Sequence, residues 1–451
     1  MSDLGLDLLF AEIQAANPVK RVGRVVEIGR GIILVSGLSD VAALGDLVEI
    51  ITENGPAKIG EILQLDARLA TILPDGFIEG LQINDRVELI GLDDIAPHES
   101  WIGRVIDPYG KALENPPVLR GPVPRALRGT PISPTERRGL GRRLETGLAV
   151  FNTLLPLVRG QRIGLFAGSG VGKSTLMGKL AIGLEADLVV FAMIGERGRE
   201  LREFVERVLG PKGMERAIVI AATSDQSALT RRRCAWTAMS VAEHFRDAGH
   251  HVLFIADSIT RFAEAHREIA MSVGEPGTLR GYPPSTAHLI TSLCERAGPG
   301  SGTASDITAI FSVLVAGSDM EEPIADILRG VLDGHVVLDR KIAERGRFPA
   351  IDLLRSVSRA LPLAASEIEN ELIMLARNRL GIFDQNEMMI QAGLYTKGTN
   401  IGIDEAIETW PMLDKFLAES EIHDTEASFA RLAKYLDIPA ETEALKVHPE
   451  K

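Results

Sequence analysis

The strongest constraint on the fold of this chain is the stretch AGSGVGKS, from Ala167 to Ser174. It follows the apolar run IGLF and leads directly into the helical pattern KSTLMGKLAIGL. A structural turn needs one or two glycines, whereas three occur here within five positions and a lysine follows them. A loop of this kind points backbone N–H groups at an anion, at the positive end of the helix dipole. The sequence therefore predicts a phosphate-binding loop between a strand and a helix.

Apolar runs that alternate with helical patterns surround this loop. They read RIGLFA, DLVVFAMIG, RAIVIAATS, HVLFIADS and ITAIFSVLVAG. Strands that alternate with helices form a parallel sheet covered on both faces, so we expect an α/β fold here. The proline- and glycine-rich segment 97–135 ahead of these runs is interpreted as an ordered connection, because Trp101, Val105 and Ile106 can pack.

The segment before the α/β part has a different pattern. Between residues 22 and 91, short β-branched runs are separated by turn signals without helices between them, which predicts a small antiparallel β-barrel. A nucleic-acid-binding barrel would carry stacking aromatics and basic residues, but Phe77 is the only aromatic residue in this segment. A structural or oligomer-forming barrel is therefore favoured.

Helical patterns replace the β-type runs beyond about Leu363. At the other end of the chain, Leu6, Leu9, Phe10 and Ile13 fall on one face of a short amphipathic helix. This helix either packs on its own barrel or docks a partner. The expected parts of the chain are an N-terminal amphipathic partner-binding segment (1–20), a β-barrel domain (21–96), a parallel-sheet P-loop domain (97–362) and a C-terminal helical domain (363–451).

Composition excludes several classes of protein. The net charge of −13 argues against a protein that binds nucleic acid by neutralising phosphates. Two cysteines, Cys234 and Cys294, cannot form a disulfide framework. The start MSDLGLDLLFAEIQ carries acids where a signal peptide is basic, and no apolar run reaches the length of a membrane span. We expect a cytoplasmic protein, peripheral to another structure.

The residues of the phosphate loop have distinct expected roles. Gly170 and Gly172 permit the tight curl, Lys173 would bridge β- and γ-phosphate oxygens, and the Ser174 hydroxyl would ligate Mg²⁺. Ala167 replaces the glycine that usually opens the motif, which is tolerable where its φ is negative. The expected nucleotide-binding residues of the loop are Gly168, Ser169, Gly170, Val171, Gly172, Lys173, Ser174 and Thr175.

Two carboxylates at strand ends complete the expected site. Asp257 ends the run VLFIAD and would hold the Mg²⁺ shell, because ligands of open α/β sheets bind at the carboxyl ends of strands. Glu196 follows the run LVVFAMIG and is the candidate for orienting and deprotonating the attacking water, while Arg197 beside it would neutralise γ-phosphate charge. No N-K-x-D motif for guanine occurs, so adenine is the favoured base.

A longer series of motifs occurs in order, including IGERGREL, HVLFIADSITRF, GEPGTLRGYPPS, LDGHVVLDRKIAERGRFPAIDLLRSVSR and GLYTKGT. Together with the phosphate loop they resemble the rotary-type ATPase subunits, and most closely the flagellum-specific ATP synthases, the export ATPases of flagellar type III secretion. The likeness extends from Val22 to at least Leu417. It implies an N-terminal β-barrel, a RecA-like core and a C-terminal helical domain, assembled as a homohexameric ring.

The resemblance also implies roles for residues that the loop does not contain. Arg359, in SVSR, matches the arginine that reaches into the neighbouring subunit's site. Phe348, in RFPAID, and Tyr395, in LYTKG, match the aromatic residues that stack on adenine. Glu196 matches the catalytic carboxylate, and Arg261, in SITRF, resembles a core arginine near the phosphates.

The family implies an ATP hydrolase that energises protein export through the flagellar type III secretion apparatus, with ATP and Mg²⁺ as cofactors. Implied partners are a stator-like regulator at the N-terminal segment, the export gate, chaperones and exported flagellar proteins. Nucleic acid is not among them, and the implied location is peripheral, at the cytoplasmic face of the inner membrane.

Other functions stay open or are disfavoured. The ATPase of a virulence type III injectisome and a catalytic subunit of an F-type or V-type ATP synthase stay open, because their motifs overlap with these. A non-catalytic subunit of an F-type or V-type ATP synthase would carry Gln in place of Glu196, so that function is disfavoured. The acidic balance and the aromatic-poor barrel disfavour an RNA-translocating hexamer, and the full set of site residues disfavours a scaffold with a dead site.

Overall fold

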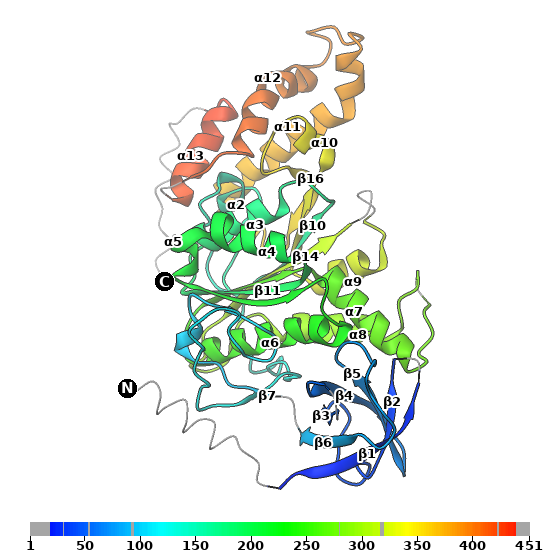
Figure 1. Cartoon of the computed structure of the whole chain (residues 1–451). Helices are drawn as coiled ribbons and strands as arrows, with labels where there is room; N and C mark the ends of the chain where they lie inside the picture. The colour runs from blue at the N-terminus through cyan, green and yellow to red at the C-terminus, as the bar shows by residue number, and fades with distance from the viewer. Residues whose placement is uncertain are drawn as a thin grey trace.

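The computed structural model describes residues 19–438, apart from 30, 53–54, 92–93, 279, 316–319 and 422–423. The described chain passes through a β-barrel, an α/β domain and a group of helices, which follow one another along the long axis of the molecule (Figure 1). The amphipathic helix expected within residues 1–20 lies almost entirely outside the described residues, so it stays a prediction. No helix of the described residues has the length and apolar character that crossing a membrane requires.

The barrel consists of antiparallel strands, closed in the order β1-β2-β5-β4-β3-β6. Side chains alternate between its inside and outside, so that Ala70 and Ile72 of one strand are buried while their neighbours are partly exposed. The barrel core also contains Val25, Ile33 and Val48. The predicted barrel is confirmed. Its strands are β1 (Arg21–Ile28), β2 (Ile33–Ser36), β3 (Leu47–Ile51), β4 (Lys58–Leu65), β5 (Leu69–Pro74) and β6 (Arg86–Gly91).

The α/β domain is built on a sheet of order β16-β15-β10-β14-β13-β11-β12-β8 within the described residues. Its strands are parallel except β16, which is antiparallel to β15. The five predicted apolar runs form β10 to β14, and β8, β15 and β16 extend the sheet beyond them. The strands are β8 (Val105–Ile106), β10 (Arg162–Ala167), β11 (Leu188–Glu196), β12 (Ala217–Thr223), β13 (Val252–Asp257), β14 (Ile307–Leu314), β15 (Gly334–Leu338) and β16 (Ile351–Ser358).

Helices cover both faces of this sheet (Figure 1). Val189 and Phe191 of β11 pack into the core on one face, and Val190 and Ala192 pack into the core on the other. The helices of the domain are α2 (Ala149–Asn152), α3 (Lys173–Gly183), α4 (Gly198–Glu203), a π-helical turn η2 (Phe204–Leu209), α5 (Gly210–Met214), α6 (Ala228–Asp247), α7 (Ile259–Ser272), α8 (Ser285–Arg296), α9 (Pro323–Val331) and α10 (Arg340–Glu344). A 3-10 turn η1 (Glu99–Trp101) and the short pair β7 (Asp94–Ile95) and β9 (Arg125–Ala126) lie ahead of them.

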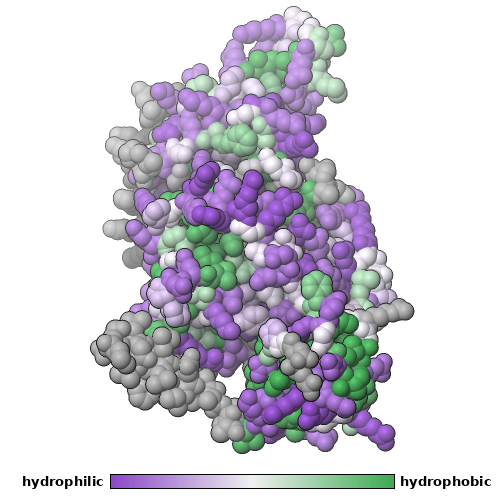
Figure 2. Space-filling model, in the orientation of Figure 1, coloured by the Kyte–Doolittle hydropathy of each residue, from purple (hydrophilic) through white to green (hydrophobic). Residues whose placement is uncertain are grey.

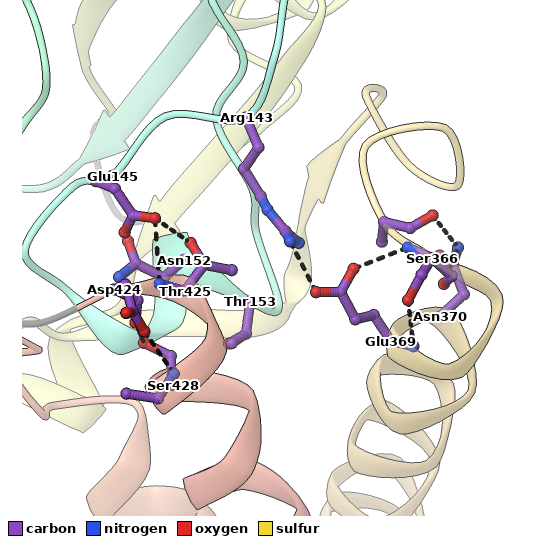
Figure 3. A network of polar contacts seen from close by, with 12 residues as sticks. Arg143, Glu145, Asn152, Thr153, Ser366, Glu369, Asn370, Asp424, Thr425 and Ser428 are labelled. Atoms are coloured by element: carbon purple, nitrogen blue, oxygen red, sulfur yellow. Dashed lines mark hydrogen bonds and ion pairs between the residues drawn. The ribbon is translucent and has the colours of Figure 1, made fainter. Parts of the chain in front are cut away.

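The C-terminal part is helical, with α11 (Glu367–Gln391), α12 (Ile401–Phe416) and α13 (Thr425–Tyr435). Figure 3 shows how polar contacts hold two of these helices on the segment that precedes and includes α2. Arg143 pairs with Glu369 at 2.7 Å, and Glu145 accepts a hydrogen bond of 2.8 Å from the Thr425 hydroxyl. Apolar side chains of these helices, such as Phe416, join the core on the α3 side of the sheet. The expected C-terminal helical domain is thus present.

Candidate active site

The phosphate loop lies between the carboxyl end of β10 and the start of α3. Gly170 has a φ of 77° and Gly172 a φ of 84°, a left-handed conformation that favours glycine. Gly172 is also the residue that caps the N-terminus of α3. Ala167, which departs from the usual motif, is the last residue of β10 and has extended backbone, so a side chain is accommodated there. Val171 is buried, whereas Ser169, Ser174 and Thr175 are exposed.

Lys173 and Asp257 contact each other directly in the structure. The Lys173 ammonium donates to Asp257 Oδ1, and Ser312 Oγ lies 3.4 Å from the ammonium nitrogen. Ser312 also donates to Asp257 Oδ1 at 2.6 Å. These three side chains come from α3, β13 and β14, which brings the loop lysine and the strand-end carboxylate together as their sequence positions suggest. The sequence did not predict a role for Ser312. The one pattern that could have indicated it is a hydroxyl residue within an otherwise apolar, buried strand.

Glu196 ends β11, the strand next to β13. It lines a cleft of about 220 Å³ together with Ser174, Thr175, Glu200 and Asp257. Burial, and after it the negative charge of Asp257, raise the pKa of Glu196 to about 7, while Lys173 acts in the opposite direction. A carboxylate with a pKa near neutrality accepts a proton from water more readily than an ordinary glutamate does.

Three arginines approach Glu196 in different ways. Arg197 is exposed over 80% of its side chain and pairs with Glu200 at 3.4 Å, so it lies at the rim of the cleft. Arg261 and Arg231 both pack over Gly195, where an added Cβ would lie 3.4 Å from each side chain. Arg261 further pairs with Glu264 at 2.8 Å. The aliphatic parts of two arginines therefore pack on the backbone turn that presents Glu196, and their charged ends pair with Glu264 and Glu268.

The two expected adenine-stacking aromatics lie in different surroundings. The ring of Phe348 lies against the phosphate loop, because a Cβ built on Gly172 would be 3.1 Å from its Cδ1 atom. Phe348 as a residue is 48% exposed. Tyr395 lies in the loop between α11 and α12, where its hydroxyl donates to the Asn400 carbonyl and to Asp404 Oδ1, each at 2.9 Å. The structure therefore brings Phe348 to the loop and holds Tyr395 by local contacts.

Arg359 lies at the opposite end of the sheet from the phosphate loop. Its backbone N–H donates to the Asp333 carbonyl at 3.0 Å. The Asp333 N–H in turn donates at 2.8 Å to the carbonyl of Arg162, the first residue of β10. The phosphate loop begins at the other end of β10, roughly 17 Å away for a strand of this length. The Arg359 side chain is exposed, and its guanidinium donates to the Arg329 carbonyl at 3.0 Å. Arg359 therefore faces away from the phosphate loop of its own chain.

Two protein families match this chain over adjacent segments. Residues 147–358 match the nucleotide-binding domain of the ATP synthase alpha/beta family. Residues 365–434 match the C-terminal domain of the type III secretion ATPase EscN. The first segment contains the phosphate loop, Glu196 and Asp257, and the second contains α11, α12 and most of α13.

Whole-chain relatives agree with these matches. The flagellum-specific ATP synthase of Caulobacter vibrioides is 40% identical over 438 residues, which cover 95% of this chain and 98% of that protein. That of Bacillus subtilis is 40% identical and covers 90% of this chain and 93% of its own length. Among solved structures, the assembled ATPase EscN of the enteropathogenic E. coli type III secretion system has a TM-score of 0.85 and 34% identity, and covers 92% of this chain and 100% of that one. A strand-flanked phosphate loop, a carboxylate-lined cleft and whole-length similarity thus agree: this chain is an ATPase that belongs to the family of the flagellum-specific ATP synthases.

Proposed function

We propose that the cleft beside Lys173 binds ATP and that Glu196 deprotonates the water that attacks the γ-phosphate. The observation that supports this most strongly is the partly buried Glu196 carboxyl, with a pKa of about 7, in the same cleft as Ser174 and Asp257. Lys173, released from Asp257, then contacts the β- and γ-phosphate oxygens. Phe348 and Tyr395 are proposed to stack on adenine, and Arg197 and Arg261 to balance phosphate charge.

Ser174 and Asp257 are the residues proposed to hold Mg²⁺. A hydroxyl and a buried carboxylate that line one cleft provide the oxygen ligands that Mg²⁺ prefers, so the donor set fits this ion. Mg²⁺ supplies charge neutralisation between the β- and γ-phosphates when it is bound. Asp257 has only 2% of its surface exposed, and the Lys173 ammonium compensates its charge in this structure, as a bound Mg²⁺ would.

Arg359 is proposed to act in the active site of a neighbouring copy, in a homohexameric ring. Its guanidinium is exposed and lies about one strand length from its own phosphate loop, which suits a role in trans. Such an arginine raises phosphoryl-transfer rates by ~10³–10⁵. The barrel offers a further contact surface, because Figure 2 shows hydrophobic residues among charged ones on it, and Val22, Val26, Val41, Leu44 and Ile90 are exposed. The EscN structure, which this chain resembles, is described as assembled.

The cellular role that fits best is to energise protein export through the flagellar type III secretion apparatus. The relatives named flagellum-specific ATP synthase carry this proposal, and EscN has been solved with its central stalk EscO. The proposed partners are a stalk protein, the export gate, chaperones and exported flagellar proteins, with a stator-like regulator at residues 1–20. The proposed location is cytoplasmic and peripheral, at the inner membrane. The domain limits 21–96, 97–362 and 363–451 are part of the same proposal.

Two inactive variants test the shared active site. Glu196→Gln should retain ATP binding and lose ~10²–10⁴ in turnover, because water loses its base. Arg359→Ala should retain Glu196 and lose transition-state stabilisation. We expect a mixture of the two purified variants to regain part of the wild-type ATPase rate, since the Arg359 of one copy completes the intact Glu196 site of the other. A mixture that stays as inactive as its components would contradict a role in trans, and a fully active Glu196→Gln variant would remove Glu196 from the chemistry.

The second candidate function is that of the ATPase of a virulence type III injectisome. The EscN likeness favours it, but identity to EscN is 34%, against 38–40% for flagellum-specific relatives from several organisms. Expression of this chain in a bacterium that lacks its flagellar export ATPase separates the two. We expect swimming to be restored, whereas rescue of injectisome secretion alone would favour the second function.

A further inference from the structure

The segment between α10 and β16 carries Phe348 to the phosphate loop. The ring rests on Gly172, so closely that an added methyl group there would be 3.1 Å from the ring. Gly172 is followed directly by Lys173, the residue that contacts the phosphates in the proposed mechanism. This contact places the Phe348 ring beside the cleft in which the nucleotide is proposed to bind.

Arg347, the residue before Phe348, fixes the shape of this segment. Its guanidinium donates to the Pro349 carbonyl at 3.3 Å and to the Ile351 carbonyl at 2.8 Å. The side chain is only 8% exposed, although its neighbour Phe348 is half exposed. A long cationic side chain that is buried among backbone carbonyls holds the chain around it in one conformation.

The same guanidinium reaches the C-terminal helices. Arg347 Nε lies 2.9 Å from Asp414 Oδ1 on α12, and 31% of the Asp414 side chain is exposed. Burial lowers the pKa of Arg347, and the facing Asp414 carboxylate opposes this effect. The pair lines a cleft against the stacked rings of Phe383 and Trp410, whose centroids are 4.6 Å apart. In Figure 1, α10 lies beside α11, and β16 runs toward this junction.

A second ion pair at this junction is weaker. Arg345 Nη1 lies 3.5 Å from Glu387 Oε1 on α11, but these side chains are 50% and 34% exposed. Exposed pairs of this kind contribute little to the energy of a contact, whereas separating a buried pair leaves a charge uncompensated. A displacement of α12 must therefore either break the Arg347–Asp414 ion pair or move Arg347 and its segment together with the helix.

We propose that the Arg347–Asp414 ion pair positions Phe348 over the phosphate loop, so that nucleotide affinity depends on where α12 lies. This inference rests on the proposed role of Phe348 in stacking on adenine. Asp414 and Arg347 are positioning residues, because they act through Phe348 and do not touch the nucleotide. By linkage, a nucleotide that stacks on Phe348 stabilises α12 in the position seen here, which gives the C-terminal helices a means to respond to nucleotide.

The test compares a ligand that has a base with one that lacks it. Asp414→Asn keeps the size of the side chain and removes its charge. We expect this full-length variant to bind the non-hydrolysable analogue AMP-PNP, with Mg²⁺, on the order of tenfold more weakly in calorimetry, in the range of couplings between contacting residues. Inorganic tripolyphosphate has no adenine, so its affinity should stay at the wild-type value.

Glu408→Gln is the matched control. It removes a carboxylate from the same helix, where Glu408 pairs with Lys397 and the two side chains are 61% and 78% exposed. Its affinity for both ligands should equal that of the wild type. Asp414→Glu restores the charge and should regain most of the AMP-PNP affinity. If any substitution at this position disrupted folding, Asp414→Glu would lose affinity as well.

Two further variants separate the possible failures. Phe348→Ala should weaken AMP-PNP binding, and adding Asp414→Asn to it should cause little further loss, because both changes act on one contact. If Phe348→Ala leaves AMP-PNP affinity unchanged, the adenine role of Phe348 fails and this inference fails with it. If Phe348→Ala weakens binding but Asp414→Asn does not, or weakens AMP-PNP and tripolyphosphate equally, the positioning role alone is overturned.

Discussion

At the scale of single residues, Glu196 shows how the fold changes the chemistry of an ordinary side chain. Burial and the neighbouring Asp257 raise its pKa to about 7, so the protonated form of the carboxyl predominates below that pH. Only the deprotonated form can accept a proton from water. We therefore expect kcat/KM for ATP, which reports on the free enzyme, to rise with pH and to reach half of its plateau near pH 7.

The control for this pH profile is a carboxylate outside the cleft. Glu206 is 55% exposed and pairs with Arg202 on the surface, so Glu206→Gln should leave the midpoint of the profile unchanged. The Glu196→Gln variant should keep a low kcat/KM for ATP that does not rise with pH near pH 7. A wild-type profile that is level from about pH 6 to pH 8 would contradict the assignment of Glu196 as the base.

At the scale of elements, two barrel carboxylates contact α6 of the ATPase domain. Glu61 of β4 pairs with Arg232 at 2.8 Å, and Asp75 lies at the start of the helix. Asp75, which follows β5, accepts hydrogen bonds from the hydroxyls of Ser227, Thr230 and Tyr109. Ser227 caps the N-terminus of α6, where a negative charge is favourable. This contact places the end of a barrel strand against the beginning of a helix that packs on β11 and β12.

Removal of this carboxylate should loosen the first turn of α6. Asp75→Ala leaves the three hydroxyls without their acceptor, which we expect to destabilise the folded protein by roughly 1–3 kcal/mol. Amide hydrogen exchange of Thr230, whose N–H donates to Ser227 Oγ at 3.1 Å, should become faster. Asp66→Ala is the control, since Asp66 bonds only its own turn through the N–H groups of Arg68 and Leu69. Unchanged exchange in α6 would show that Asp75 does not hold this junction.

The elements that the sequence predicted share a simple signal. Each of β10 to β14 is a continuous apolar run, and Glu196 and Asp257 stand at the ends of two of them, which is why the site carboxylates were found. β15 has only five residues, and β16 exposes Leu354 and Arg355 on the sheet edge, so neither pattern distinguishes a strand. Contacts between distant segments, such as Asp75 with Thr230, depend on which elements become neighbours, and no local pattern encodes that.

At the scale of the whole molecule, each chain of the proposed ring would contribute to two active sites. The phosphate loop lies at one end of β10, and Arg359 lies near its other end. Turnover per molecule should therefore rise with protein concentration as copies associate, and Arg359→Ala should lose most of this rise. Steady-state assays over a dilution series, together with light scattering, measure both quantities. Equal turnover at all dilutions by a monomeric protein would contradict the shared site.

The placement of Arg359 also bears on genetics. In the proposed ring, a copy that lacks this arginine would impair the active site of the next copy rather than its own, because its own phosphate loop and Glu196 stay intact. In a cell that carries a normal and a mutant allele, mutant copies would assemble into rings with normal copies and inactivate the active sites of their neighbours. An Arg359 allele should therefore be dominant, whereas an allele whose product cannot associate should be recessive.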